Sequence, residues 1–171
     1  MNAISKAAQV ASVRDDYKPQ CLAVTEVRWT GTGETTLQSK YSIIYSGNDN
    51  THMNGVALMI PSVRRSLIDW MPVNGRLMRV RLQGKYANLS IIVSYSPTNE
   101  ADENSKEEFY TQLQWLVDKT PRQDILLIMG DLNAQVGSHN EDLEGIMGKH
   151  GCGARNENAN CWWTFAILTR W

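Results

Sequence analysis

Two acidic residues closely follow apolar segments, and the carboxyl ends of buried strands are where many α/β proteins bind ligands. Glu26 comes after the apolar residues 21–24, and Asp131 comes after the mostly apolar residues 124–129. A carboxylate there can bind a hard cation such as Mg2+, which takes a few oxygen ligands and keeps several waters. Asn133 lies two residues further on and could orient a water molecule or a phosphate oxygen. These residue types indicate metal-assisted hydrolysis of a phosphodiester, although such carboxylates more often cap helices or lie in solvated turns.

Three further side chains near predicted strand ends could assist that chemistry. Tyr95 stands at the end of an apolar segment, where its plainer interpretation is a buried ring with a hydroxyl in water. Arg28 and Trp29 follow Glu26 and could offer a cation and a stacking surface to a nucleic acid. The alternative for these two residues is a surface pair that covers the edge of the core.

The composition limits the class of protein. The length of 171 residues predicts one domain of ordinary size (~150 residues). The formal net charge of -1 excludes a broad basic surface, so any contact with DNA must be local. The apolar stretches are far shorter than the ~20 residues of a membrane span, and the first 20 residues lack the apolar core of a secretory signal. We therefore expect an intracellular protein, nuclear or cytoplasmic, with no membrane partner. The 3 cysteines cannot all pair within the chain, which fits a reducing compartment, and their spacing to histidine disfavours zinc.

The hydrophobic pattern predicts the strands that must position these side chains. Six segments have the apolar runs or the alternation of strands: 21–24, 43–45, 56–60, 76–83, 87–95 and 124–129. We expect 21–24 and 124–129 to be buried on both faces because their apolar runs are continuous. Residues 76–83 alternate, which predicts a half-buried strand. A turn-rich segment between 43–45 and 56–60 predicts a hairpin.

Helices and loops complete the pattern. Residues 4–14 predict a short helix. Ser105 and Glu108 have the spacing of a capping box and begin a second helix, whose apolar face continues to Leu116. The glycine-rich polar residues 137–153 predict a long loop, and long loops in compact domains are often functional.

Four motifs, in this order, resemble one known family. They are TEVRWTG at 25–31, GVAL at 55–58, YSPTN at 95–99 and GDLNA at 130–134. The sequence resembles the endonuclease/exonuclease/phosphatase superfamily. Within it, the sequence is most similar to the apurinic-type endonuclease domain of non-LTR retrotransposons of the LINE and RTE type. It also resembles the craniofacial-development-protein-like sequences derived from them. The segment GKHGCG at 148–153 also looks like that subgroup.

The resemblance implies a fold and a set of roles. The fold would be α/β, a four-layer sandwich in which two mixed sheets face each other and helices cover the outside. Glu26 matches the Mg2+-binding glutamate, where Mn2+ could substitute, and Tyr95 matches the tyrosine that touches the scissile phosphate. Asp131 matches the aspartate that activates or positions the attacking water, and Asn133 matches the asparagine that orients phosphate and water. Relatives often place an asparagine three residues after the tyrosine, whereas here it follows one residue later, as Asn99.

The family pattern also includes a first strand and C-terminal strands, the latter with a Ser-Asp-His element, that this sequence does not contain. We therefore expect residues 1–158 to be an incomplete, C-terminally truncated domain and residues 159–171 to be an unrelated apolar tail that packs irregularly.

The expected function is Mg2+-dependent hydrolysis of DNA by an endonuclease, impaired or inactive in this chain. The alternative is a catalytically dead retroelement-derived remnant that acts at most as a weak binding module. A phosphatase or phospholipase branch of the family is disfavoured by residues 28–31. No obligate protein partner is inferred.

Overall fold

The computed structural model of the chain describes residues 19–37, 41–61, 66–139, 141, 143–148 and 150–169. The chain divides into two compact units. Unit 1 comprises Met1–Tyr95 and Lys119–Gly130, and unit 2 comprises Ser96–Asp118 and Asp131–Trp171. The helix predicted over residues 4–14 lies outside the described residues. In the part of the chain that the structure describes, no helix is both long and apolar enough to cross a membrane.

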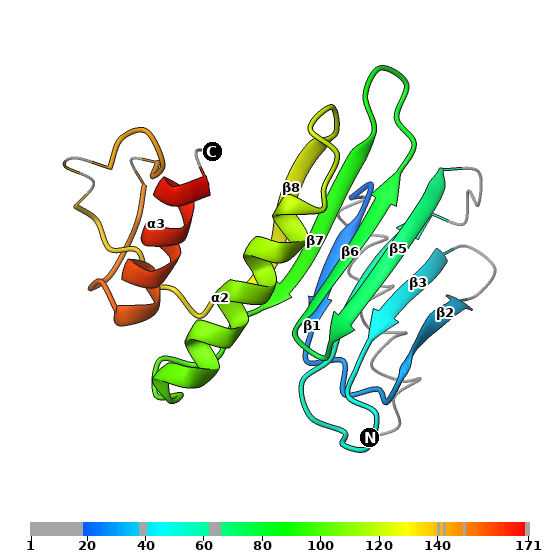
Figure 1. Cartoon of the computed structure of the whole chain (residues 1–171), viewed down its shortest axis with the longest axis horizontal. Coiled ribbons are helices and arrows are strands. Elements are labelled where there is room, and N and C mark those ends of the chain that lie inside the picture. Colours follow the sequence, from blue (N-terminus) through cyan, green and yellow to red (C-terminus); the bar gives the residue numbers. More distant parts are fainter. Residues whose placement is uncertain are drawn as a thin grey trace. The chain divides into compact units, whose positions relative to one another are not determined.

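In the described residues, eight strands form two four-stranded sheets (Figure 1). Sheet A contains, in spatial order, β1 (Leu22–Thr25), β4 (Val56–Pro61), β3 (Tyr41–Ser46) and β2 (Thr32–Leu37). Sheet B contains, in spatial order, β5 (Leu67–Asn74), β6 (Leu77–Leu82), β7 (Leu89–Tyr95) and β8 (Ile125–Asp131). The predicted hairpin is confirmed, because β3 and β4 pair antiparallel. The mixed α/β class with two sheets is also confirmed.

β8 runs parallel to its neighbour β7. The amide of Ile125 donates to the carbonyl of Asn88 at 2.8 Å, and the amide of Ser96 donates to the carbonyl of Asp131 at 2.9 Å. From the first hydrogen bond to the second, the residue number increases along both strands, from 88 to 96 and from 125 to 131. The carboxyl ends of β7 and β8 therefore lie at the same edge of sheet B.

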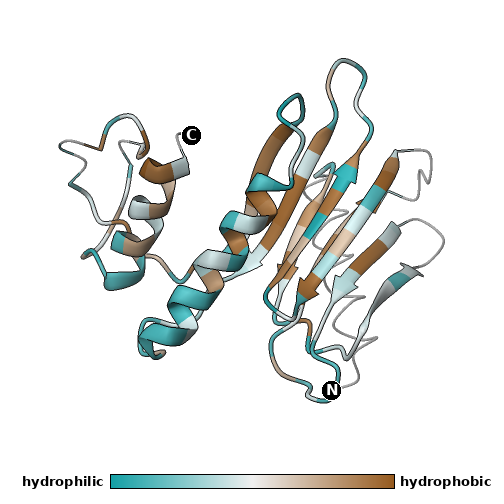
Figure 2. Cartoon of the chain, viewed as in Figure 1, coloured by the Kyte–Doolittle hydropathy of each residue, from teal (hydrophilic) through white to brown (hydrophobic). Residues whose placement is uncertain are grey.

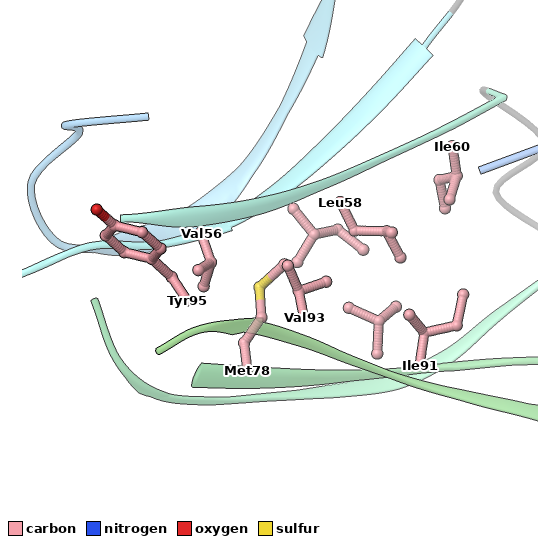
Figure 3. Close-up of a cluster of buried hydrophobic side chains, with 9 residues drawn as sticks. Val56, Leu58, Ile60, Met78, Ile91, Val93 and Tyr95 are labelled. Atoms are coloured by element: carbon pink, nitrogen blue, oxygen red, sulfur yellow. The ribbon is translucent and has the colours of Figure 1, made fainter. Parts of the chain in front are cut away.

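The two sheets of unit 1 share one apolar core (Figure 3). Sheet A contributes four buried side chains, Ile44, Val56, Leu58 and Ile60. Sheet B contributes five, Met78, Val80, Ile91, Val93 and Tyr95. Burying one such aliphatic side chain stabilises a protein by roughly 1.5–3 kcal/mol. The period-two spacing of 78 and 80, and of 91, 93 and 95, is what brings these residues to one face.

The face of β6 that points away from the core is more buried than the prediction of a half-buried strand implies. Arg79 is only 6% exposed, and its guanidinium contacts Asp69 at 3.0 Å and the Lys119 carbonyl at 2.9 Å. Arg81 donates two hydrogen bonds to the carboxylate of Asp124, at 2.6 and 2.9 Å. Long basic side chains can be buried in this way when acidic partners and carbonyls accept from most of their N–H groups. Arg79 Nε is the exception, because it is buried without a hydrogen-bond partner among the described residues. Most of β6 is therefore buried on both faces.

β1 and β8 are less buried than predicted. All four residues of β1 are only partly buried. Ile125 and Leu127 of β8 are 57% and 40% exposed. Both strands lie at the edge of a sheet, so each has only one neighbouring strand. A continuous apolar run does not by itself distinguish an edge strand from a central one.

Unit 2 contains α2 (Glu103–Asp118) and α3 (Glu157–Thr169). The predicted capping box at Ser105 is wrong by one turn, because the N-cap of α2 is Asp102. The carboxylate of Asp102 accepts from the backbone amide of Ser105 at 2.9 Å and from its hydroxyl at 2.7 Å. Aspartate at this position accepts a hydrogen bond from a helix N–H that has no partner within the helix.

The expectation of an irregular tail beyond residue 158 is wrong. Residues 157–169 form α3, and Ala159, Trp163, Phe165 and Ala166 are buried. The boundary expected between 158 and 159 falls inside this helix. The Arg155 guanidinium lies 3.9 Å from the centre of the Trp163 ring. Figure 2 shows the apolar character of the C-terminal half of α3. In residues 137–153, the described positions contain no helix or strand, as predicted for a loop.

Candidate functional site

The end of β1 holds Glu26 and Arg28 in an uncommon backbone conformation. Their φ angles are 55° and 58°, in the left-handed region that side-chain-bearing residues rarely adopt. The loop between β3 and β4 maintains it, because Val27 N donates to Gly55 O at 3.1 Å and Arg28 N donates to Asn54 O at 2.8 Å. Non-glycine residues in this conformation are concentrated at functional sites. The two side chains are about half exposed, 49% for Glu26 and 60% for Arg28.

Unit 1 brings together three of the predicted site residues. The Tyr95 hydroxyl donates a hydrogen bond of 2.7 Å to Glu26 Oε1 across 69 residues of sequence. Arg28 Nη2 donates to the other oxygen, Glu26 Oε2, at 3.2 Å. Figure 3 shows the Tyr95 ring at one end of the core cluster and its hydroxyl directed away from that cluster. Tyr95 thus anchors its ring in the core and presents its oxygen to the carboxylate.

Arg76 is part of the same site and was missed by the sequence analysis. Its guanidinium carbon lies 5.2 Å from the centre of the Tyr95 ring, and its Nη1 donates to the Tyr95 carbonyl at 3.2 Å. Burial lowers the pKa of the Arg76 guanidinium from its ordinary value, although Tyr95 opposes this shift. Asn74 precedes it in an Asn-Gly turn and accepts from the amides of Arg76 and Leu77 at 2.8 and 3.1 Å. The Asn74-Gly75 dipeptide, which is typical of a tight turn between two strands, was the sequence signal that could have located Arg76 at a strand end.

Trp29 supports the structural alternative. Its ring meets Tyr45 edge-on, with 4.9 Å between the ring centres. The side chain is partly buried and packs against a second apolar cluster that includes Ile43 and Met59. The expectation that Trp29 offers a stacking surface to nucleic acid stays a prediction.

Unit 2 brings together Asp131 and Asn133. The backbone amide of Asn133 donates to Asp131 Oδ1 at 2.9 Å, and Asn133 has a φ of 49°. The Asn133 side-chain amide donates to the Ser96 carbonyl at 2.8 Å. Asp131 is exposed, whereas Asn133 is partly buried. One oxygen of the aspartate thus orders the turn that holds the asparagine.

Three asparagines that the sequence analysis left without a role support this turn. The carbonyl of Asn133 accepts from the side-chain amides of Asn156, at 2.9 Å, and Asn158, at 3.2 Å. Asn158 is 1% exposed and also donates to the Pro97 carbonyl at 2.8 Å. Asn99 accepts from the amide of Glu157 at the start of α3, at 3.1 Å. Asn99 is therefore a helix cap, and only the repeated asparagines at 156, 158 and 160 hinted at this network.

The candidate site residues offer carboxylate oxygens that can bind a metal, N–H groups that can donate to a phosphate, and the Tyr95 hydroxyl. Carboxylates such as those of Glu26 and Asp131 bind a hard divalent cation better than a soft one. In the described part of the chain, no three His, Cys, Asp or Glu side chains form a ready metal cluster. Mg2+ needs only one or two carboxylates, with waters and phosphate completing its shell.

Similarity to solved structures identifies the fold. The structure is similar to the endonuclease domain of TRAS1, a telomere-specific non-LTR retrotransposon, with a TM-score of 0.61 over 95% of this chain and 64% of that chain, at 13% identity. It is also similar to D. rerio TDP2 complexed with a single-strand DNA product, with a TM-score of 0.52 over 86% of this chain and 61% of that one, at 14% identity. The chain has the endonuclease/exonuclease/phosphatase fold.

Relatives of this chain are also found by sequence. It is 42% identical over 137 residues to craniofacial development protein 2 of Bos taurus and 40% identical over 137 residues to that of Tragulus javanicus. These matches cover 80% of this chain and 23% of each relative. The chain thus spans about a quarter of the length of the curated relatives it matches. No family model matches it.

The expectation that Glu26 binds a divalent cation predicts that replacing Arg28 with glutamine raises the affinity for Mn2+ on the order of tenfold. The guanidinium competes for Glu26 and repels a divalent cation, and its exposed ion pair is itself worth only about 0–1 kcal/mol. Mn2+ binding can be measured by electron paramagnetic resonance. Arg122→Gln, at an exposed arginine of unit 1, is the matched control, and Glu26→Gln should remove the binding. Unchanged affinity in the Arg28 variant would contradict the expectation that Glu26 binds the metal.

Proposed function

We propose that the chain carries the site of a Mg2+-dependent DNA endonuclease, with turnover that is strongly impaired. The observation that carries the proposal is the 2.7 Å hydrogen bond between Tyr95 and Glu26. It joins two family motifs that are distant in sequence, at the end of β1 and the end of β7. Stabilisation of the core does not by itself explain this hydrogen bond, because the Glu26 carboxylate is half exposed.

The residues fit the metal that the family implies. Glu26 would hold Mg2+, or Mn2+ in its place, through a carboxylate that water can reach. The metal would neutralise charge on the phosphate and lower the pKa of a bound water. Tyr95 would donate its hydroxyl hydrogen bond to a phosphate oxygen. We propose that Asp131 and Asn133 contribute to the same reaction, by holding the attacking water and by donating an amide N–H to the phosphate.

DNA is the proposed substrate class. The solved D. rerio TDP2 structure contains a single-strand DNA product, and the TRAS1 domain is an endonuclease. In this chain, Arg28 is the exposed cation of unit 1 beside Glu26 and Tyr95, so a phosphate contact there would be local, as a net charge of -1 requires. Weak, salt-dependent binding follows from so few phosphate contacts.

The engagement of Glu26 supports the impairment and a second candidate function. Both carboxylate oxygens already accept hydrogen bonds, one from Tyr95 and one from Arg28. A metal must compete with these donors. The second candidate is therefore a remnant that binds DNA weakly and performs no hydrolysis, the role of Glu26 being to orient Arg28 and Tyr95.

A plasmid-nicking assay tests the proposal. Purified protein with Mg2+ should nick supercoiled DNA, or DNA with an abasic site, no faster than its Asp131→Ala variant. Losing one electrostatic stabiliser of such a reaction typically costs ~10²–10³ in rate. Robust Mg2+-dependent nicking that Asp131→Ala abolishes would overturn the proposed impairment and indicate an active endonuclease. Fluorescence anisotropy of labelled single-stranded DNA separates the candidates, because Mg2+ should strengthen binding at an endonuclease site and leave the remnant unaffected. No DNA binding at all would overturn both.

A further inference from the structure

Unit 2 contains a groove between α2 and α3 that the proposed nuclease chemistry does not use. Its volume is about 820 Å³, enough for several side chains of a ligand. Its apolar wall is formed by Tyr110, Trp115, Phe165 and Leu168. Trp115 is 45% exposed and Leu168 is 75% exposed. Large exposed apolar side chains gathered at one place are typical of interaction surfaces.

The charged residues that line the groove are acidic. Three of the described lining residues are acidic, Glu107, Asp118 and Glu157, and none of the described lining residues is basic. The one basic residue of the two helices is Lys106, which is 3% exposed. Its ammonium group contacts the carboxylates of Glu103 at 3.0 Å and Glu157 at 2.9 Å. Lys106 is thus held inside the unit and pairs with Glu157. The exposed residues Glu107 and Asp118 remain as the acidic rim of the groove.

We propose that this groove binds a cationic amphipathic segment of a partner protein. Such a segment inserts apolar side chains between the two helices and places lysine or arginine beside the acidic rim. This is the helix-in-groove mode of peptide recognition, in which apolar anchors provide affinity and charge selects the partner.

The acidic rim argues against other occupants. A second copy of the chain docking through the same surface would bring the carboxylates of two rims together, and like charges at an interface are unfavourable. DNA and an anionic lipid surface are repelled for the same reason. The proposal concerns unit 2 alone and does not depend on the proposed nuclease function.

Two designed peptides test the charge selectivity. They have identical leucine positions at helical spacing, and the remaining positions are all lysine in one peptide and all glutamate in the other. With fluorescein-labelled peptides, anisotropy should report binding of the lysine peptide to the full chain and no binding of the glutamate peptide. Raising the salt concentration should weaken the complex, because exposed charge pairs are screened. Equal binding of both peptides would overturn the proposal.

Three variants locate the contact. Trp115→Ala should weaken binding roughly tenfold, because an aromatic side chain that the bound peptide buries contributes strongly to an interface. Glu107→Gln combined with Asp118→Asn should weaken it several-fold. Glu108→Gln is the matched control, because Glu108 lies on α2 outside the groove lining and is exposed. If Glu108→Gln weakens binding as much as the groove variants do, the attraction is unspecific and the proposal fails.

Cys161 gives a local readout that is independent of affinity. Cys161 is one of the residues that line the groove, and burial raises the pKa of its thiol. In a Cys21→Ser, Cys152→Ser background, alkylation of Cys161 by iodoacetamide should slow several-fold when the lysine peptide is bound. Binding without protection would place the peptide elsewhere and overturn the assignment. Sedimentation of the free protein completes the test, since a dimer that Trp115→Ala dissociates would identify a second copy as the occupant.

Discussion

Replacing Gly130 with alanine is expected to lower the urea concentration at which unit 1 unfolds far more than an ordinary surface substitution. Gly130 has a φ of 137°, which only glycine adopts readily. A Cβ atom at this position would lie 1.9 Å from the Ser94 carbonyl oxygen. The backbone conformation alone costs a residue with a side chain roughly 1–3 kcal/mol, and the collision with β7 adds to it. Urea unfolding followed by far-UV circular dichroism measures the loss.

The same substitution also bears on the site. Gly130 is the penultimate residue of β8 and directly precedes Asp131, so any shift that relieves the collision moves the end of the strand. Gly145→Ala is the control, because a Cβ atom there meets nothing within 4 Å. Equal unfolding midpoints for the two variants would show that β7 and β8 do not approach each other closely at Gly130 in solution.

The second large effect is expected from Asp124→Asn at neutral pH. The Asp124 side chain is completely buried, and it accepts hydrogen bonds from Arg81 at 2.6 and 2.9 Å and from Ser90 at 2.7 Å. Removing one partner of a buried ion pair is strongly destabilising because the other charge stays buried without compensation. The variant should therefore unfold at a markedly lower temperature and urea concentration than the wild type.

The pH dependence of this difference can be derived from the pKa of Asp124. Its hydrogen bond with Arg81 is the main cause that holds the pKa below the ordinary value, and Ser90 adds to it. A carboxyl with a depressed folded-state pKa contributes stability that is complete above its unfolded pKa, about 3.9. That stability is lost as the pH falls through the folded pKa. The gap between wild type and Asp124→Asn should thus persist at about pH 5 and shrink below about pH 4.

Asp49→Asn serves as the comparison for this series, because Asp49 is an exposed aspartate in the loop between β3 and β4. Its unfolding curve should stay close to that of the wild type at every pH. A gap between wild type and Asp124→Asn that stays constant down to the lowest pH would mean that ionisation of Asp124 is not what stabilises unit 1.

The sequence by itself determined the strands with a strong apolar signal. β1, β3, β4, β7 and β8 follow from their short continuous apolar runs. β6 and α2 follow from periodicity, because an element with one buried face repeats apolar residues at its own period. β2 (TGETTL) and β5 (LIDWMPVN) were missed, since the first is polar and the second contains a proline. α3 was missed because its apolar residues extend around most of the helix and leave no clear polar face.

The sequence also determined which residues could form the site, since motif order named Glu26, Tyr95, Asp131 and Asn133. Only the tertiary structure decided their partners. The contact of Tyr95 with Glu26 spans 69 residues, and that of Asn158 with Pro97 spans 61. Periodicity reports how one element is buried, whereas such contacts depend on sheet pairing, loop conformation and capping between distant segments. That is why Arg76, Asn156 and Asn158 became visible only once the chain was folded.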